Sequence, residues 1–242
     1  MRWLSSLALM LCCLMPVSSW ATFSVANSGG TAEAPSLTTI AQTLTTVTAG
    51  DAVAIFVTHE GLVTSITVSD GSSTFASCTK TTHANADLHG QWFYTLSSVA
   101  SGTVTYTATF GAARISRSIS VLELSHAVTV DIDVCGQGSG NATALTSANV
   151  TTTGSVGAGL GGYAPYSAAV FSAPLINGTA ATTTVTAGDG RAWFLALSST
   201  FSNGAATATL ATASEYIVNI LVLKEVTAGT TETFGFRRRR QQ

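Results

Sequence analysis

The stretch QWFYTLSS at residues 91–98 recurs as AWFLALSS at residues 192–199, so that Trp92 and Trp193 stand 101 positions apart. The same displacement relates SISVLE at 118–123 to NILVLK at 219–224, and GDAVA at 50–54 more weakly echoes GSVGA at 154–158. A displacement that holds over several segments indicates a duplicated unit. The chain is therefore predicted to carry two copies of one unit, at about residues 34–128 and 142–226.

The units have the texture of β-strands. Residues 103–110 alternate between Thr and apolar residues, which is the period of a half-buried strand. Residues 52–57 and 217–223 are nearly continuous apolar runs of strand length, which predicts central strands buried on both faces. No segment carries a helical stripe with caps, and turns rich in Gly, Asn and Ser follow one another closely.

The predicted fold is an all-β, jelly-roll-like β-sandwich built from the two pseudo-repeats. No Pro-rich or charged linker separates the units, and a shared sandwich would cover edges that each unit alone exposes. Two tandem Ig-like domains are the alternative. The sandwich is assigned residues 22–230, between a leader at 1–21 and an Arg-rich tail at 231–242.

Five segments carry a resemblance to a known class of module: GDAVAIFV (50–57), ITVSD (66–70), WFY (92–94), GTVTYTATF (102–110) and SVLELS (120–125). Together they resemble duplicated jelly-roll or Ig-like modules of secreted and surface-exposed bacterial and phage-associated proteins. The resemblance implies a β-sandwich over most of the mature chain. It implies no particular activity, because one fold serves many functions.

The N-terminus reads as a secretory signal peptide. Arg2 precedes an apolar stretch from Trp3 to Met15, Pro16 breaks it, and small residues precede a cleavage point after Ala21. The mature protein is therefore expected to be secreted, extracellular or periplasmic, without a transmembrane anchor. No later apolar run approaches the roughly 18 residues of a spanning helix.

The body of the chain is acidic. Only 9% of the 242 residues are charged, and apart from Arg2 and the four C-terminal arginines, five basic residues stand against twelve acidic ones. The body is not expected to bind nucleic acid, because phosphate contacts need Lys and Arg on the binding face. Four consecutive arginines, Arg237, Arg238, Arg239 and Arg240, are a candidate site for an anionic surface.

Two cysteines, Cys78 and Cys135, remain after removal of the leader. An even pair in an exported chain predicts a disulfide. The bond would close a loop of 57 residues, for which the chain-entropy treatment gives about 4 kcal/mol of stabilisation.

Two acidic or imidazole clusters are candidate metal sites. His83, Asp87 and His89 occur at alternate positions, so an extended backbone would place them on one face. Asp131 and Asp133, with Asp70, offer oxygen ligands for calcium. A polar hairpin loop and an exposed strand end are the respective alternatives, and no other cofactor is expected.

Aromatic residues suggest a sugar platform, because an aromatic face complements the partly apolar face of a sugar ring. Trp92 and Trp193 are repeat-equivalent and followed by Phe, which favours core positions. Tyr163 and Tyr166, around Pro165, are therefore the candidate ligand-binding residues.

Catalytic machinery is not predicted. The sequence has no Gly-x-Ser-x-Gly elbow, and Glu123, whose repeat counterpart is Lys224, is expected on the surface. The leading hypothesis is a non-catalytic extracellular β-sandwich that acts as a surface, adhesion or structural module, with polysaccharide or a cell-surface component as partner. A carbohydrate-binding module is one alternative. The other is a homo-oligomeric assembly subunit in which residues 22–37 pair with a neighbour's sheet.

Overall fold

The computed structural model describes residues 23–226 except 62–64, 84–86, 155 and 167–169. The described residues form strands and turns, with no helix. The strands are β1 Ser24–Glu33, β2 Leu37–Val47, β3 Ala52–Glu60, β4 Ile66–Ser69, β5 Ala76–Ser77, β6 Thr81–His83, β7 Leu88–Thr95, β8 Gly102–Arg114, β9 Arg117–Ser125, β10 Val130–Thr146, β11 Gly157–Pro165, β12 Phe171–Ile176, β13 Thr179–Ala180, β14 Thr183–Ala187, β15 Gly190–Leu197 and β16 Ala206–Glu225.

The first unit, β1 to β9, is a two-sheet sandwich. One sheet has the order β1-β9-β3-β7-β5, with β6 also paired to β7, and it faces the three-stranded sheet β2-β8-β4. The predicted alternation of β8 is confirmed, since its apolar residues are buried and its threonines lie on the outer face. Val104 and Phe110 of β8 pack against Ile55 of β3 in the core between the two sheets.

The second unit, β10 to β16, builds its sandwich from one sheet that curls over itself. The 20-residue strand β16 pairs through its first half with β12 and the end of β10, and through its second half with β11 and the start of β10. A register shift between Ala142 and Ala144 of β10 accompanies the bend. The curled sheet encloses its own core, which includes Trp193 and Ile220.

The duplication is visible in the strand order. The row β1-β9-β3-β7 of the first unit corresponds to β10-β16-β11-β15 in the second, and β2-β8-β4 corresponds to the end of β10, the start of β16 and β12. In each unit the first and last segments pair side by side, and the second strand lies in the opposite sheet, as in a jelly roll. The all-β sandwich prediction is confirmed, with the finer finding that each unit closes a core of its own.

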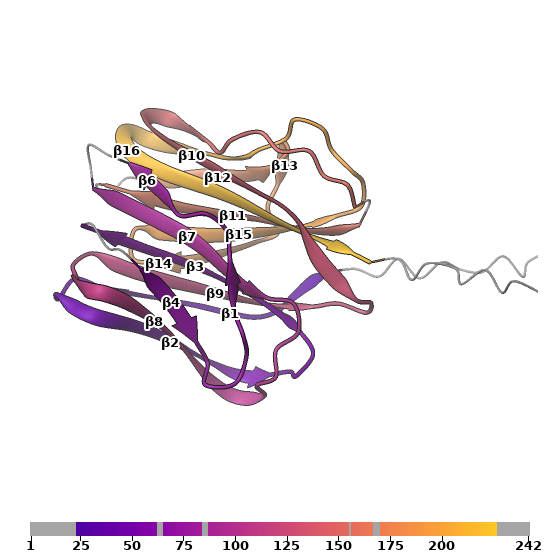
Figure 1. Cartoon of the computed structure of the whole chain (residues 1–242). Helices are drawn as coiled ribbons and strands as arrows, with labels where there is room; N and C mark the ends of the chain where they lie inside the picture. Colours follow the sequence, from indigo (N-terminus) through magenta and orange to yellow (C-terminus); the bar gives the residue numbers. More distant parts are fainter. Residues whose placement is uncertain (1–22, 62–64, 84–86, 155, 167–169, 227–242) are drawn as a thin grey trace, which may run out of the picture.

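The two units meet where the β1-β9-β3-β7-β5 sheet of the first lies against the β11, β15 and β14 part of the curled sheet of the second. In the stack of layers in Figure 1, β2, β8 and β4 lie at one end and β12 and β13 at the other. A third core fills this boundary, with Phe56 and Trp92 from the first unit and Leu160 and Phe194 from the second. Phe56 lies so close to Gly162 that a Cβ there would come within 2.6 Å of its ring.

Trp92 and Trp193 are both fully buried, which confirms the prediction of core positions. They nevertheless lie on different faces, since Trp92 faces the boundary between the units and Trp193 faces the core of the second unit. Trp92 pairs across the sheet with Phe56, which on its other side pairs with Ser120, 28 residues after Trp92. Trp193 pairs in the same way through Gly161 with Ile220, 27 residues after Trp193. A slip of one residue reverses the face of every side chain on a strand.

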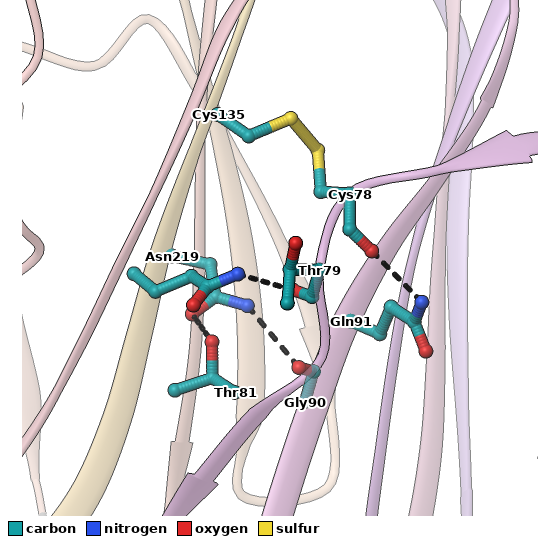
Figure 2. Close-up of a disulfide and its surroundings, with 8 residues drawn as sticks. Cys78, Thr79, Thr81, Gly90, Gln91, Cys135 and Asn219 are labelled. Carbon is teal, nitrogen blue, oxygen red and sulfur yellow. Dashed lines mark hydrogen bonds between the residues drawn. A yellow bond between two sulfur atoms is a disulfide. The ribbon is translucent and has the colours of Figure 1, made fainter.

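The predicted disulfide is confirmed: Cys78 and Cys135 are bonded, with their Cα atoms 6.0 Å apart. Cys78 belongs to the first unit and Cys135 to β10, so the bond ties the two units together. Figure 2 shows that polar contacts across the same boundary accompany it, with buried Asn219 of β16 accepting from Thr81 at 2.5 Å and donating to the Gly90 carbonyl at 3.2 Å.

Candidate functional site

A polar groove of about 410 Å³ lies between the two units. Both units contribute to its walls: the ends of β1, β3 and β11, the start of β9, and the turn between β14 and β15. The residues used below are Glu33, Thr58, Glu60, Arg117, Ser118, Pro165, Tyr166, Gly188, Asp189 and Gly190.

Tyr166 is the exposed aromatic residue of this groove. Its side chain is 54% exposed, and it follows Pro165, the last residue of β11. The Tyr166 N–H donates to the Glu215 carbonyl at 2.8 Å, which holds the backbone at the groove wall. Tyr166 is thus open to solvent, as a platform residue requires, and its role in ligand binding stays a prediction.

Tyr163, the other predicted platform residue, is not exposed, and that prediction is wrong. It lies on β11, is fully buried in the core of the second unit, and stacks on Phe171 with 5.2 Å between ring centroids. A loop was expected around Pro165, but strand β11 continues through Tyr163 to Pro165. Burial raises the pKa of the Tyr163 hydroxyl, with Asp189 opposing and Arg191 favouring ionisation by smaller amounts.

Three carboxylates surround the groove, each from a different segment. Glu33 ends β1, Glu60 ends β3, and Asp189 occupies the turn between β14 and β15. Glu33 has a 37% exposed side chain, Glu60 is half-buried and Asp189 is exposed. The groove wall therefore carries acceptor oxygens that water or a ligand can reach.

The basic residue of the lining, Arg117, is already engaged by the protein. Its guanidinium is buried, ion-paired with Glu33 at 2.8 Å, and donates to the carbonyls of Pro35 and Thr39. The pair arises from register, because Glu33 and Arg117 stand opposite each other where β1 ends and β9 begins. Arg117 thus fixes the wall and is ion-paired with one of its three carboxylates, Glu33.

The turn between β14 and β15 fits closely against the first unit. A Cβ on Gly190 would lie 2.5 Å from the Ser118 hydroxyl, and Ser118 itself shares a 2.6 Å hydrogen bond with Thr58. Gly188 has a φ of +58°, and a Cβ there would lie 2.6 Å from the Cβ of Ala32. The glycines therefore let the two halves of the groove approach each other.

The predicted metal ligands lie in separate parts of the structure. Asp87 and His89 are near each other, with Oδ1 and Nε2 3.5 Å apart, and His83 lies on the neighbouring strand β6. Asp131 and Asp133 lie on β10, in the other unit. Among the residues that the structure describes, no three His, Cys, Asp or Glu side chains converge closely enough to hold a metal ion.

The calcium candidates already have protein partners. Asp133 accepts from the Thr153 N–H and hydroxyl and from the Gly154 N–H, and Lys224 Nζ lies 3.6 Å from its carboxylate. Asp70 accepts from the backbone of the turn that follows it. These hydrogen bonds lower the pKa of both carboxyls against an opposing effect of burial, and they assign both residues to loop stabilisation.

Glu123 is fully buried, so the expectation of a surface position is wrong. It points into the core of the first unit, where its Oε1 accepts from the Thr48 N–H at 2.6 Å and Asp51 lies beside it. Burial raises the pKa of the Glu123 carboxyl; the Thr48 hydrogen bond acts in the opposite direction, and neighbouring Asp51 adds to the rise. Nothing in the local pattern distinguished Glu123 from an outward-facing residue, because β9 is buried on both faces.

A second hollow of about 770 Å³ lies where β9 and β10 connect, beside His126 and Glu225. It borders Val226, the last described residue, and none of the described residues that line it is a tyrosine or tryptophan. The predicted leader at 1–21 and Arg237–Arg240 lie outside the described residues.

Comparison with known proteins gives no match to a family model, to a curated protein or to a solved structure. In the described part of the chain, no helix has the length and hydrophobicity needed to cross a membrane.

Proposed function

We propose that this protein is a non-catalytic extracellular β-sandwich module that binds saccharide in the groove between its two units. The observation that carries the proposal is the exposed Tyr166 in a polar groove that also carries the carboxylates of Glu33, Glu60 and Asp189. The disulfide between Cys78 and Cys135 supports an oxidising compartment outside the cytoplasm.

The chemistry of the groove suits a sugar. An aromatic face covers the C–H face of a pyranose ring, and the carboxylates of Glu33, Glu60 and Asp189 accept hydrogen bonds from ring hydroxyls. A volume of about 410 Å³ falls within the range of small-molecule sites. Both units contribute, so the groove depends on the duplicated architecture.

The test is calorimetric titration of the mature, disulfide-bonded chain with neutral and charged oligosaccharides. Tyr166→Ala should lose at least about fivefold in affinity, since a stacked ring contributes about 1 kcal/mol or more. Tyr166→Phe should retain binding because it keeps the ring. Val170→Ala, another exposed apolar residue, is the matched control.

The outcome against the proposal is clear. If no saccharide binds at millimolar concentration, or if Tyr166→Ala binds as well as the wild type, the groove is not a sugar site. Thermal melts of the variants separate loss of binding from loss of fold, and Tyr166→Ala should melt like the wild type because its side chain is largely exposed.

No observation favours assembly through the N-terminal strand. Residues 24–33 pair with β9 of the same chain along the whole length of β1. The neighbouring edge strand β2 has its carbonyls at Thr39 and Thr45 occupied by side chains from β9 and β1. Such contacts reduce the capacity of an edge to accept a further strand.

A further inference from the structure

We infer that the groove between the units selects saccharides that carry a free ammonium group, that is, amino sugars without the N-acetyl group. The inference rests on the proposed function and names its ligand class. It follows from the combination of an exposed aromatic ring with three carboxylates around one groove.

The first step concerns charge. Glu33, Glu60 and Asp189 line the groove, whereas the guanidinium of the lining residue Arg117 is buried and directed at Glu33 and backbone carbonyls. A ligand entering the groove therefore meets carboxylate oxygens and no guanidinium that is open to solvent among the lining residues. A cationic ligand gains attraction that a neutral one does not.

Two further arginines stand beside the groove and do not line it. Arg191 donates to the carbonyls of Gly188 and Gly190, so its charge is turned toward the backbone of the turn. The Arg114 side chain lies against Gly61, 3.3 Å from the position of a Cβ there. Both lie outside the lining, whose own ionisable side chains are three carboxylates and the buried Arg117.

The second step concerns geometry. In the described residues no three acidic side chains converge on one point, so the carboxylates suit a ligand with separated donors better than a metal ion. Tyr166 adds to the preference, because an aromatic face attracts an ammonium group as well as a sugar ring. An amino sugar offers a ring face, hydroxyl donors and a positive charge together.

The experiment compares two probes of equal length, a trimer of N-acetylglucosamine and a trimer of glucosamine, titrated into the mature disulfide-bonded protein. The titrations are run at about pH 6, where the glucosamine amines are largely protonated. The glucosamine trimer should bind about tenfold more tightly, since exposed ion pairs each contribute a few-fold. The preference should shrink when salt is raised from about 0.05 M to about 0.5 M.

Variants assign the effect to the groove. Glu60→Gln and Asp189→Asn should each reduce the preference for the glucosamine trimer about threefold and leave binding of the acetylated trimer unchanged. Asp131→Asn removes an exposed carboxylate on β10, outside the groove, and should change neither. Tyr166→Ala should weaken both trimers.

Each outcome discriminates. If both trimers bind equally, the inference about charge is wrong and the saccharide function stands. If neither binds, both fall. If Tyr166→Ala still binds the glucosamine trimer like the wild type, or if a lysine tripeptide binds as tightly, the attraction is one of charge alone and the amino-sugar assignment is overturned.

Discussion

The imidazole rings of His59 and His89 stack 4.7 Å apart in the first unit, where β3 and β7 place them directly opposite each other. Both residues are buried, and Phe110 of β8 closes over His59 at 5.3 Å. Burial, together with the second imidazole, lowers the pKa of His59 to about 3. Burial also lowers the pKa of His89, with Lys80 contributing and Asp87 opposing.

This pair predicts a loss of stability in acid. A base whose pKa is lower in the folded than in the unfolded protein stabilises the fold fully above the unfolded pKa of 6.5, and this contribution is lost as the pH falls from 6.5 toward about 3. At pH 5 the loss from His59 alone is about 2 kcal/mol. Urea unfolding measured between pH 8 and pH 4.5 gives the slope.

His59→Asn provides the comparison. The variant is expected to be less stable at pH 8, because it leaves a gap beside Phe110, but to lose less free energy of unfolding between pH 7 and pH 5 than the wild type does. An equal slope in the two proteins would show that the histidine pair does not set the acid response.

Glu123 predicts the opposite dependence. Its pKa is raised in the folded protein, so the stability it contributes is present below its ordinary pKa of 4.5 and is lost as the pH rises through the folded value. Glu123→Gln mimics the protonated acid, and its amide retains an acceptor for Thr48 and gains a donor toward Asp51. The stability of the variant relative to the wild type should therefore increase from pH 4 to pH 8. A constant difference over that range would contradict this assignment.

Much of the fold was predictable because the local periodicity of the sequence predicts its β-strands. The alternation of residues 103–110 and the apolar run at 52–57 became β8 and β3 as expected. The side of the strand on which a residue lies was harder to predict, as Trp92 and Trp193 show. A difference of one residue in strand register places a side chain on the opposite face, and the register is set by strands distant in sequence.

The candidate site was predictable only in part. Tyr166 follows a proline in a segment with loop character, and the sequence identified it. The meeting of Glu33, Glu60 and Asp189 gave no signal, because these residues come together only when two units, each folded around its own core, are placed side by side. Composition and spacing describe residues that are close in sequence, whereas this groove is formed by residues that are distant in sequence.

Arg117→Met is predicted to destabilise the protein by about 1–2 kcal/mol, because it removes a buried guanidinium from the partly exposed Glu33 and from the carbonyls of Pro35 and Thr39. The double variant with Glu33→Leu should recover part of the loss, since no carboxylate then remains unpaired. Chemical denaturation of the wild type and the two variants measures both effects. Similar stability of Arg117→Met and the wild type would show that the contact does not hold β1 and β2 together.

The disulfide between Cys78 and Cys135 should stabilise the protein chiefly by restricting the unfolded chain. It closes a loop of 57 residues, for which the entropic contribution is about 4 kcal/mol. The free energy of unfolding of the double variant Cys78→Ser with Cys135→Ser should therefore be lower by about 4 kcal/mol, as measured by denaturant unfolding. Unfolding should remain a single transition, because the core shared by the units, with Phe56 against Gly162, does not depend on the bond. Reductant should bring the wild type to the stability of the variant and leave the variant unchanged. Two separate transitions in the variant would instead mean that the bond, rather than the shared core, makes the units fold as one.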